Sequence, residues 1–233
     1  MTVIITPSIA EKLALAVERF KQEVEVPPAD AWKSMSDGLL WLRVLEQIAV
    51  VGKAASGRAL REELGSEAEL WWSHLKPLPE SERQVEIHRR LRSAGVRYVM
   101  PDSAECKKTK AAVYDFGVLE SYGGPRQYFA HLASVPMEPW RISAIVDEMA
   151  YIKDKGARDL LIELGLVRDA IAFDTRLKAV LERLGAELPK DLATNRARYK
   201  ALERELLSKV CVPCGVSGGH LDRILFNHWQ EVG

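Results

Sequence analysis

Residues 36–52, with the sequence SDGLLWLRVLEQIAVVG, restrict the fold more than any other stretch of the chain. Ser36 is a residue type that begins helices, and the residues after it are apolar on nearly every side of the helix that they would form. A helix that is apolar all round is normally covered by other elements, as in the centre of a helical bundle. With 233 residues, 47% of them hydrophobic, the chain is large enough to provide that cover.

Most other segments also space their apolar residues as helices do. Ser8 is predicted to begin the first helix, and from Trp140 apolar residues recur at every third or fourth position as far as Ile152. Residues 191–210 repeat the pattern, whereas runs with the composition of a strand, such as VRYVM, are short. The sequence therefore predicts an all-α fold.

The charge and cysteine content exclude several classes of protein. Lysine plus arginine and aspartate plus glutamate both number 33, so the molecule has no overall field to attract nucleic acid, and any basic surface must be local. Three cysteines, Cys106, Cys211 and Cys214, are too few for a disulfide framework and favour a reducing compartment. The residues MTVIITPSIAEK lack the pattern of a signal peptide, and no apolar run approaches the length that spans a membrane, so neither is expected. We therefore expect a cytoplasmic protein without a membrane partner.

The stretch MAYIKDKGARDLLIELGLVRDAIAFDTR, residues 149–176, contains the candidate site. An apolar helix end is followed by the turn KDKG, by a second apolar helix that Gly165 closes, and by Asp174 at the start of a third helix. Asp174 is therefore predicted to be an N-cap, with its carboxylate beside the exposed amides of the first helical turn.

This stretch resembles the helix-hairpin-helix DNA glycosylase superfamily. Its members have a hairpin, a lysine followed after one residue by an alanine, an apolar helix, and an aspartate about eighteen to nineteen residues after the lysine. Lys155, Ala157 and Asp174 fit that spacing. The buried helix at 36–52 and the segments LRSAGVRY and LDRILF are similar to parts of the archaeal-type 8-oxoguanine DNA glycosylases, which extends the resemblance over most of residues 36–229.

The resemblance implies a fold and an activity. It implies a two-lobed helical bundle with a helix-hairpin-helix motif, in which residues 36–170 form one lobe, residues 1–35 and 171–233 form the other, and the active-site cleft lies between them. The activity would be excision of a damaged or modified base from double-stranded DNA by a monomer. The iron-sulfur loop of the superfamily needs four cysteines, so with three no cluster is expected. No Gly-x-Gly-x-x-Gly or Walker-type loop occurs in the sequence, so a nucleotide cofactor is not expected either.

The chemistry of base excision assigns roles to the candidate residues. Asp174 would stabilise the cationic sugar of the transition state, and Lys155 would attack C1′ and form a Schiff base, which adds strand cleavage to base release. The base would be extruded from the duplex into a pocket. The residues expected to contact DNA are Lys153, Gly156, Arg158 and Arg176, and those expected to contact the base are Gln47, Phe226 and Trp229.

The hairpin departs from the superfamily pattern and leaves two alignments open. The hairpin is usually built on two glycines, and here Tyr151 and Lys153 stand in their places. A second alignment makes Gly156 a hairpin glycine and puts Arg158 at the position of the catalytic lysine, but it shortens the following helix. Lys155 is favoured because its alignment needs no gap and keeps the alanine.

Simpler interpretations stand beside these. Taken by itself, Asp174 has the pattern of an ordinary N-cap. Gln47 is explained equally well as an amide bonded to backbone in the core, and for Phe226 and Trp229 packing into the core is the favoured interpretation. The group Lys107, Lys108 and Lys110 favours a solvated face. The segment CVPC with His220 and His228 lacks a second close pair, so no metal site is predicted.

Two rival functions also remain. The first is a glycosylase without lyase activity for a bulky base, such as a hypermodified phage pyrimidine, admitted by loops around Trp71 and Trp72. The second is a DNA-binding protein without catalysis, whose hairpin holds only phosphates.

Overall fold

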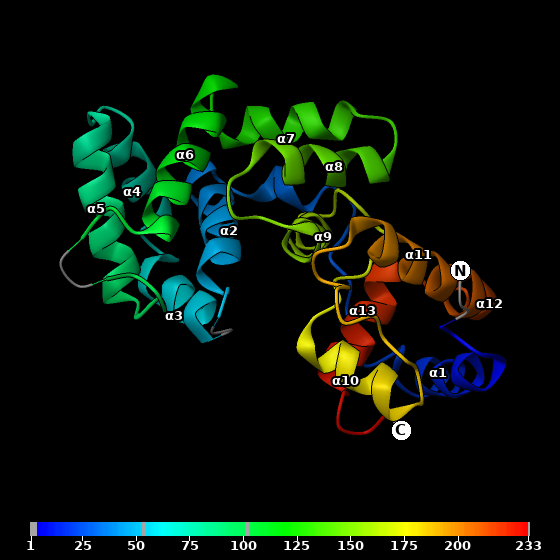
Figure 1. Ribbon diagram of the computed structural model, residues 1–233. Coiled ribbons are helices and arrows are strands. Elements are labelled where there is room, and N and C mark those ends of the chain that lie inside the picture. Colours follow the sequence, from blue (N-terminus) through cyan, green and yellow to red (C-terminus); the bar gives the residue numbers. More distant parts are fainter. Residues whose placement is uncertain (1–3, 53–54, 101–102, 233) are drawn as a thin grey trace. The chain divides into compact units, whose positions relative to one another are not determined.

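The computed structural model describes residues 4–52, 55–100 and 103–232, and Figure 1 shows these residues as helices joined by turns. No strand occurs in these described residues, so the prediction of an all-α fold is confirmed. Within the same residues, no helix combines the length and the apolar character that crossing a membrane requires.

The chain divides into two compact units, which we call the central unit and the terminal unit. The central unit is Asp30–Lys153, and the terminal unit combines the described residues of Met1–Ala29 and Asp154–Gly233. The resemblance implies boundaries after residues 35 and 170, whereas these units divide after Ala29 and after Lys153. The second boundary falls earlier in the structure because helix α9 (Asp154–Glu163) is tied to later helices, through Arg158 with Glu203 and through Glu163 with Arg223.

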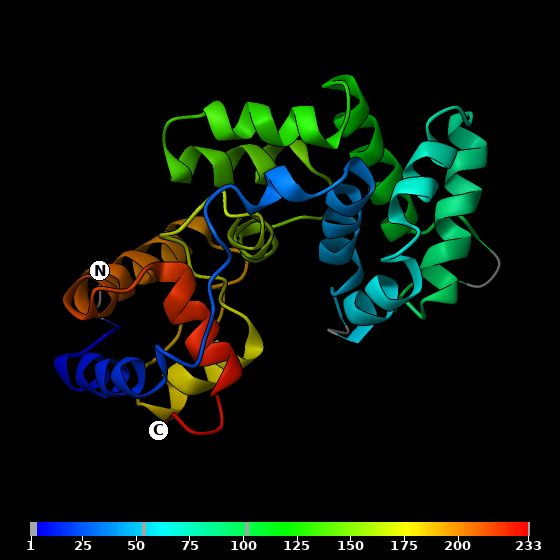
Figure 2. The same cartoon turned by 180° about the vertical axis from the view of Figure 1, so that it is seen from behind.

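The central unit is arranged around helix α2 (Asp37–Ala49), the helix that the apolar run 36–52 predicts. Figures 1 and 2 show α2 among its neighbours. The elements of this unit are η1 (Ala31–Ser34), a 3-10 turn, α2, α3 (Ala55–Leu64), α4 (Ala68–Leu75), α5 (Glu80–Ser93), α6 (Lys107–Ser121), α7 (Pro125–Ser134) and α8 (Glu138–Glu148). Helix α2 is apolar on nearly every side, and the helices that it contacts, α3, α4, α6 and α7, cover these sides.

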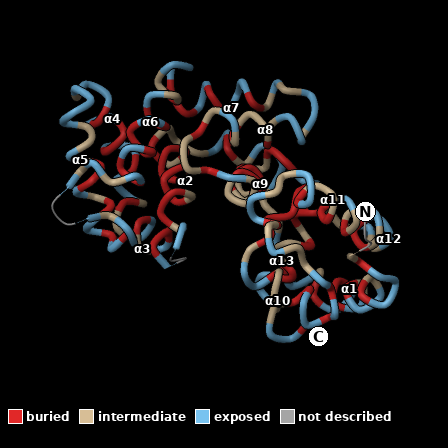
Figure 3. The backbone as a smooth tube through the Cα atoms, in the orientation of Figure 1, coloured by how far each residue is buried: buried red, intermediate tan, exposed pale blue. Residues whose placement is uncertain are grey.

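Local details fix α2 in this place. The Ser36 side chain accepts the N–H of Leu39 at 3.3 Å, so Ser36 is the predicted N-cap. A Cβ on Gly38 would lie 2.2 Å from the carbonyl oxygen of Ala68, so only glycine lets α4 approach this closely. The centre of the unit is aromatic, with the rings of Trp41, Trp72 and Phe116 in mutual contact. Figure 3 shows buried residues of α2, α4 and α6, the helices that carry these rings.

Lys108 corrects the expectation of a solvated lysine face. Its side chain is buried, and its Nζ donates to the carbonyl oxygens of Ala49 at 3.1 Å and Val51 at 2.7 Å, at the C-terminal end of α2. The positive charge therefore satisfies carbonyl groups that the helix leaves unpaired. Burial lowers the pKa of Lys108 to about 8. Lys107 and Lys110 are exposed, as expected.

The terminal unit has its own apolar core, to which both ends of the chain contribute. Its helices are α1 (Pro7–Phe20), α9, α10 (Thr175–Arg183), α11 (Arg196–Leu206), the π-helical turn η2 (Leu207–Cys211), α12 (Val212–Cys214) and α13 (Gly218–Asn227). Two helix starts differ from expectation. Helix α1 is capped by Thr6 rather than Ser8, because Pro7 occupies the first turn, where its missing N–H costs nothing. Helix α11 begins only after its cap, Asn195.

Candidate functional site

The loop that leads into α10 is fixed by side chains from two other helices. Three successive backbone N–H groups donate to them: Ile171 to Glu203 at 2.9 Å, Ala172 to Asp222 at 2.8 Å, and Phe173 to the hydroxyl of Tyr199 at 3.0 Å. Tyr199 also donates to the carbonyl oxygen of Ile171 at 2.9 Å. A loop without secondary structure thus has its backbone groups satisfied, and the residue at its end, Asp174, has a defined position.

Close packing supports the same loop from α13. A Cβ on Gly218 would lie 2.9 Å from both the nitrogen and the oxygen of Ala170, so the first residue of α13 has to be a glycine for this contact. The N–H of the next residue, Gly219, donates to the carbonyl oxygen of Arg168 at 2.8 Å. The start of α13 and the loop therefore form one packed unit, which places Asp222, one turn into α13, beside Ala172.

Asp174 is the N-cap of α10, as predicted. One carboxylate oxygen accepts the N–H of Leu177 at 2.8 Å, and the backbone at Asp174 is extended, as N-cap residues are. The side chain is partly buried. Its charge lies at the positive end of the helix dipole, and one hydrogen-bonded oxygen fixes the orientation of the other.

Lys155 lies in the first turn of α9, where its Nζ is 3.0 Å from a carboxylate oxygen of Asp159. The side chain is 37% exposed, so the amine is accessible from solvent. The sequence predicts Lys155 as the nucleophile, and in the structure its amine is paired with Asp159 at the surface of the terminal unit. An attack by the amine would require the pair with Asp159 to open and a proton to leave.

Asp222 is a further site residue that sequence reasoning did not single out. Its pKa is raised to about 8, first by burial and then by the charges of Asp159 and Asp174, while the N–H of Ala172 and the charge of Lys155 act in the opposite direction. Asp159, Asp174 and Lys155 therefore all lie within electrostatic reach of Asp222. In the sequence, the only sign of this role is that Asp222 is an acidic residue within the mainly apolar segment LDRILF.

The sequence allows two roles for Arg158, a contact with DNA or the position of the catalytic lysine, and its environment in the structure suits neither role. The guanidinium is 1% exposed and binds both oxygens of Glu203, at 2.7 and 2.9 Å, and it also donates to Asp154. Burial would lower the pKa of Arg158, but Glu203 raises it above its usual value. The structure therefore corrects the expectation that Arg158 contacts DNA, since its donors are used inside the core. It also gives no support to the alignment that puts Arg158 at the lysine position.

The remaining predicted DNA contacts lie in or beside the same helices. Lys153 is exposed immediately before α9, and Gly156 is in the first turn of α9. Arg176, in the first turn of α10, is exposed, and its guanidinium lies 4.3 Å from the centre of the Phe226 ring.

The residues expected in a base pocket differ in their surroundings within the two units. Phe226 is 43% exposed and has Arg176 over one face of its ring, whereas Trp229 packs against the core of the terminal unit. Gln47 belongs to α2 in the central unit and is partly buried. Trp71 and Trp72 are buried in the central unit, so they do not form the open loops that the bulky-base alternative invoked.

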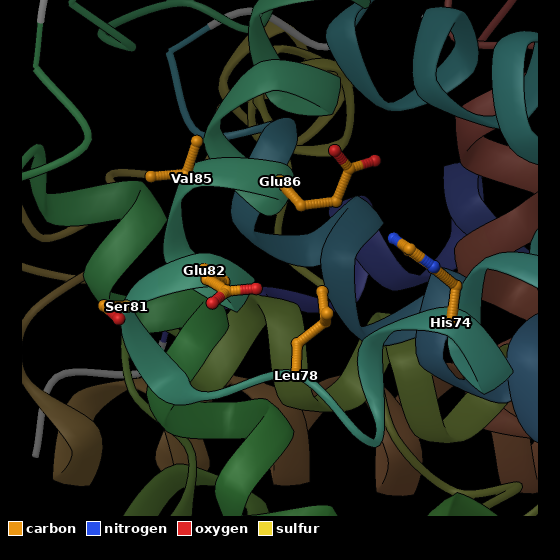
Figure 4. Close-up of a pocket in the computed structure, with 6 residues that line it drawn as sticks. All are labelled: His74, Leu78, Ser81, Glu82, Val85 and Glu86. Carbon is orange, nitrogen blue, oxygen red and sulfur yellow. The ribbon is translucent and has the colours of Figure 1, made fainter.

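A surface pocket in the central unit, with a volume of about 470 Å³, is shown in Figure 4. Its lining residues come from α4, α5 and the connection between them: His74, Leu78, Ser81, Glu82, Val85 and Glu86. None of the predicted site residues lines it. Two of its side chains are acidic, which is the wrong charge for a phosphate backbone.

Cysteine and histidine side chains are not arranged as a metal site in the described part of the chain. No group of three or more histidine, cysteine, aspartate or glutamate residues there is placed to hold an ion. Cys211 is buried, and burial raises the pKa of its thiol to about 12. A thiol in that state is neither a reactive nucleophile nor a ready metal ligand.

Comparisons with known proteins identify related folds. No family model matches the sequence, and no curated protein matches it either. Among solved structures, the 8-oxoguanine DNA glycosylase of Methanocaldococcus jannaschii has a TM-score of 0.68 and 16% identity, covering 94% of this chain and 92% of that one. The 8-oxoguanine DNA glycosylase of Thermotoga maritima has a TM-score of 0.66 and 19% identity, covering 94% and 93%.

A third structure contains nucleic acid. It is the Methanocaldococcus jannaschii 8-oxoguanine glycosylase/lyase in complex with a 15mer DNA containing 8-oxoguanine, with a TM-score of 0.64 and 17% identity over 97% of this chain and 93% of that one. At these identities the likeness is one of fold. The resemblance to archaeal-type 8-oxoguanine DNA glycosylases is thus confirmed for the fold.

Proposed function

We propose that this protein is a DNA glycosylase that extrudes and excises a damaged or modified base from double-stranded DNA, acting as a monomer. The observation that carries the proposal is the position of Asp174. Three backbone N–H groups directly before it are held by Glu203, Asp222 and Tyr199, and the carboxylate is oriented by the N–H of Leu177. An ordinary N-cap needs only the last of these contacts.

Such a carboxylate suits the difficult step of base excision. As the bond between base and sugar breaks, positive charge develops on the sugar, and a fixed carboxylate stabilises it without having to reorganise. Asp174 is proposed for this role. The fold likeness to three glycosylase structures, one of them with DNA containing 8-oxoguanine, supports the same chemistry.

Lys155 is proposed as the nucleophile of a combined glycosylase and lyase. Its amine, once deprotonated, attacks C1′, and the electron pair of the glycosidic bond leaves with the base, which takes up a proton. The sugar ring then opens to a Schiff base on Lys155. Loss of a proton from C2′ breaks the bond between C3′ and its oxygen and cleaves the strand, and water finally releases the lysine.

The ion pair between Lys155 and Asp159 supports one alternative. If the pair stays closed when DNA binds, Lys155 remains an ammonium and water has to attack C1′ in its place. Base release would then occur without strand cleavage. Asp174 has the same role in both versions, because the charge that develops on the sugar is the same.

The decisive experiment is a base-release assay on duplexes that carry different damaged or modified bases, 8-oxoguanine first, with the freed base identified by mass spectrometry. Borohydride is added in parallel, because it traps a lysine Schiff base as a stable adduct. Release with an adduct supports the combined activity, and release without one supports the monofunctional alternative. Asp174→Asn serves as the control, because asparagine is also a good N-cap and preserves the fold while removing the charge.

A non-catalytic DNA-binding protein gives a different result in the same experiment. It would bind duplexes with a strong dependence on salt and with no preference for a lesion, and it would release nothing from any substrate. That outcome would refute the proposed activity.

A further inference from the structure

The turn between α8 and α9 contains a tyrosine in a backbone conformation that favours glycine. Tyr151 has a φ of 69°, in the left-handed region. The other non-glycine residues with positive φ in the described chain are Asp30 and Tyr98. Aspartate tolerates this region, but a residue as bulky as tyrosine is strained there. The resemblance to helix-hairpin-helix proteins puts a hairpin glycine at position 151, so the backbone keeps the conformation of a glycine that the sequence lacks.

Buried contacts on both sides hold Tyr151 in this conformation. The preceding N–H, of Ala150, donates to a carboxylate oxygen of Asp115 at 2.6 Å, and Asp115 is itself fully buried in α6. Met149 before it and Ile152 after it are both buried. The turn is therefore fixed by its surroundings, whatever side chain position 151 carries.

The Tyr151 side chain contributes little to these contacts. It is partly exposed, and among the described residues no group forms a hydrogen bond or a ring contact with it. The hydroxyl groups of Tyr199 and Tyr122, in contrast, both donate to protein acceptors, Tyr199 to the carbonyl oxygen of Ile171 in the core and Tyr122 to Glu148 at the surface. A glycine at position 151 would satisfy the backbone without strain, so the phenol has no evident use in the isolated molecule. Backbone strain that the surroundings maintain is typical of binding sites.

We propose that the Tyr151 hydroxyl donates a hydrogen bond to a backbone phosphate of duplex DNA. Tyrosine is among the side chains that commonly contact DNA phosphates, and the exposed Lys153 lies two residues away in the same turn. The phenol is a neutral donor of fixed direction, whereas the lysine supplies charge. A tyrosine at a hairpin glycine position therefore supplies a phosphate contact by its side chain, while the backbone keeps the conformation of the glycine. This inference rests on the proposed function, because it requires that the protein binds DNA.

The test compares Tyr151→Gly and Tyr151→Phe with the wild-type protein, by fluorescence anisotropy with a lesion duplex at fixed salt and by denaturant unfolding. Tyr151→Gly is expected to unfold at the same or a higher denaturant concentration, because it removes the strain, and yet to bind DNA about two- to ten-fold more weakly. Tyr151→Phe keeps the ring and the strain and loses only the hydroxyl, so it is expected to lose nearly as much affinity.

Two control variants separate this contact from other effects. Tyr98→Gly changes a tyrosine that also has positive φ, 65°, and is 58% exposed, and it is expected to leave DNA affinity unchanged. Lys153→Ala is expected to weaken binding and also to reduce its salt dependence, which Tyr151→Phe should not do because the phenol carries no charge. If Tyr151→Gly and Tyr151→Phe bind as tightly as wild type, the inference is overturned while the proposed function stands. If wild type binds no duplex, both are overturned.

Discussion

The guanidinium of Arg158 binds both carboxylate oxygens of Glu203, with Nε 2.7 Å from one and Nη2 2.9 Å from the other. The first of these oxygens also accepts the N–H of Ile171 at 2.9 Å. A buried ion pair therefore joins α9, which carries Lys155, to the loop that ends at Asp174. The two residues proposed for catalysis come from separate segments of the chain, and this pair fixes those segments to one another.

Removing one partner of this pair is expected to affect both stability and activity. Glu203→Ala removes the carboxylate that binds two nitrogens of the buried Arg158 and leaves Asp154 as a remaining anionic partner, and breaking a buried pair typically costs about 3–5 kcal/mol of unfolding free energy. It also removes the acceptor of the Ile171 N–H, so base release should fall. Urea unfolding and single-turnover release measure the two effects. A loss of stability below about 1 kcal/mol would mean that water reaches Arg158 and replaces the carboxylate.

The matched control is the double variant Arg158→Met with Glu203→Leu. It replaces the ion pair by apolar side chains of similar volume, which is often neutral for stability. Stability should then recover, but release should stay low because the Ile171 N–H still lacks its acceptor. Recovery of both would show that the charge pair, and not the loop contact, sustains activity.

Features that depend on neighbouring residues were predictable from the sequence. The apolar run of α2 and its cap Ser36 required only helical periodicity and a hydroxyl at the right place. Asp174 as an N-cap and Gly165 with a φ of 66° after α9 follow from the same local rules. Each of these expectations concerns residues within a few positions of one another.

Features that depend on distant partners were not predictable. Lys108 was expected in solvent, but the free carbonyl groups at the end of α2, far back in the sequence, make burial of its charge favourable. Arg158 was expected at the DNA surface, but Glu203, 45 residues later, pairs with it in the core. Asp222 gained its place in the site only because α13 packs on the loop before Asp174. Local patterns contain no information about such partners.

Asp222 is expected to act through the loop rather than through its charge at neutral pH. Its pKa is raised to about 8 by burial and by the charges of Asp159 and Asp174, so at pH 7 the carboxyl is mainly neutral. Asp222→Asn keeps a neutral acceptor for the Ala172 N–H and should retain release at pH 7. Asp222→Ala leaves that N–H unpaired, at a cost of about 1–3 kcal/mol, and should lose release.

A pH series completes this test. Above pH 8 the wild-type Asp222 ionises and the asparagine variant does not, so the two release profiles should diverge only there. Equal loss of release by Asp222→Asn and Asp222→Ala at pH 7 would contradict this account, because it would show that the ionised carboxylate is required.

Lys155 is expected to be essential for the covalent adduct but not for DNA binding. Lys155→Gln removes the amine and should abolish borohydride trapping with only a small loss of affinity. Asp159→Asn removes the partner at 3.0 Å and should retain trapping, or speed it up, because the amine no longer has to leave an ion pair. Lys12→Gln, at an exposed position of α1, controls for the loss of one positive charge. Persistent trapping by Lys155→Gln would assign the nucleophile to another amine.

Asp115, which fixes the turn before Tyr151, is expected to make the stability of the central unit depend on pH. Burial raises its pKa from 3.8 to about 8, so between these values the unfolded chain has lost a proton that the folded chain retains. Stability therefore falls as pH rises from about 4 to 8, by at most about 1.4 kcal/mol per pH unit. Asp115→Asn keeps an acceptor for the Ala150 N–H and cannot ionise. Its advantage over wild type in urea unfolding, followed by tryptophan fluorescence, should grow over this range and level off above pH 8; an advantage independent of pH would contradict the assignment.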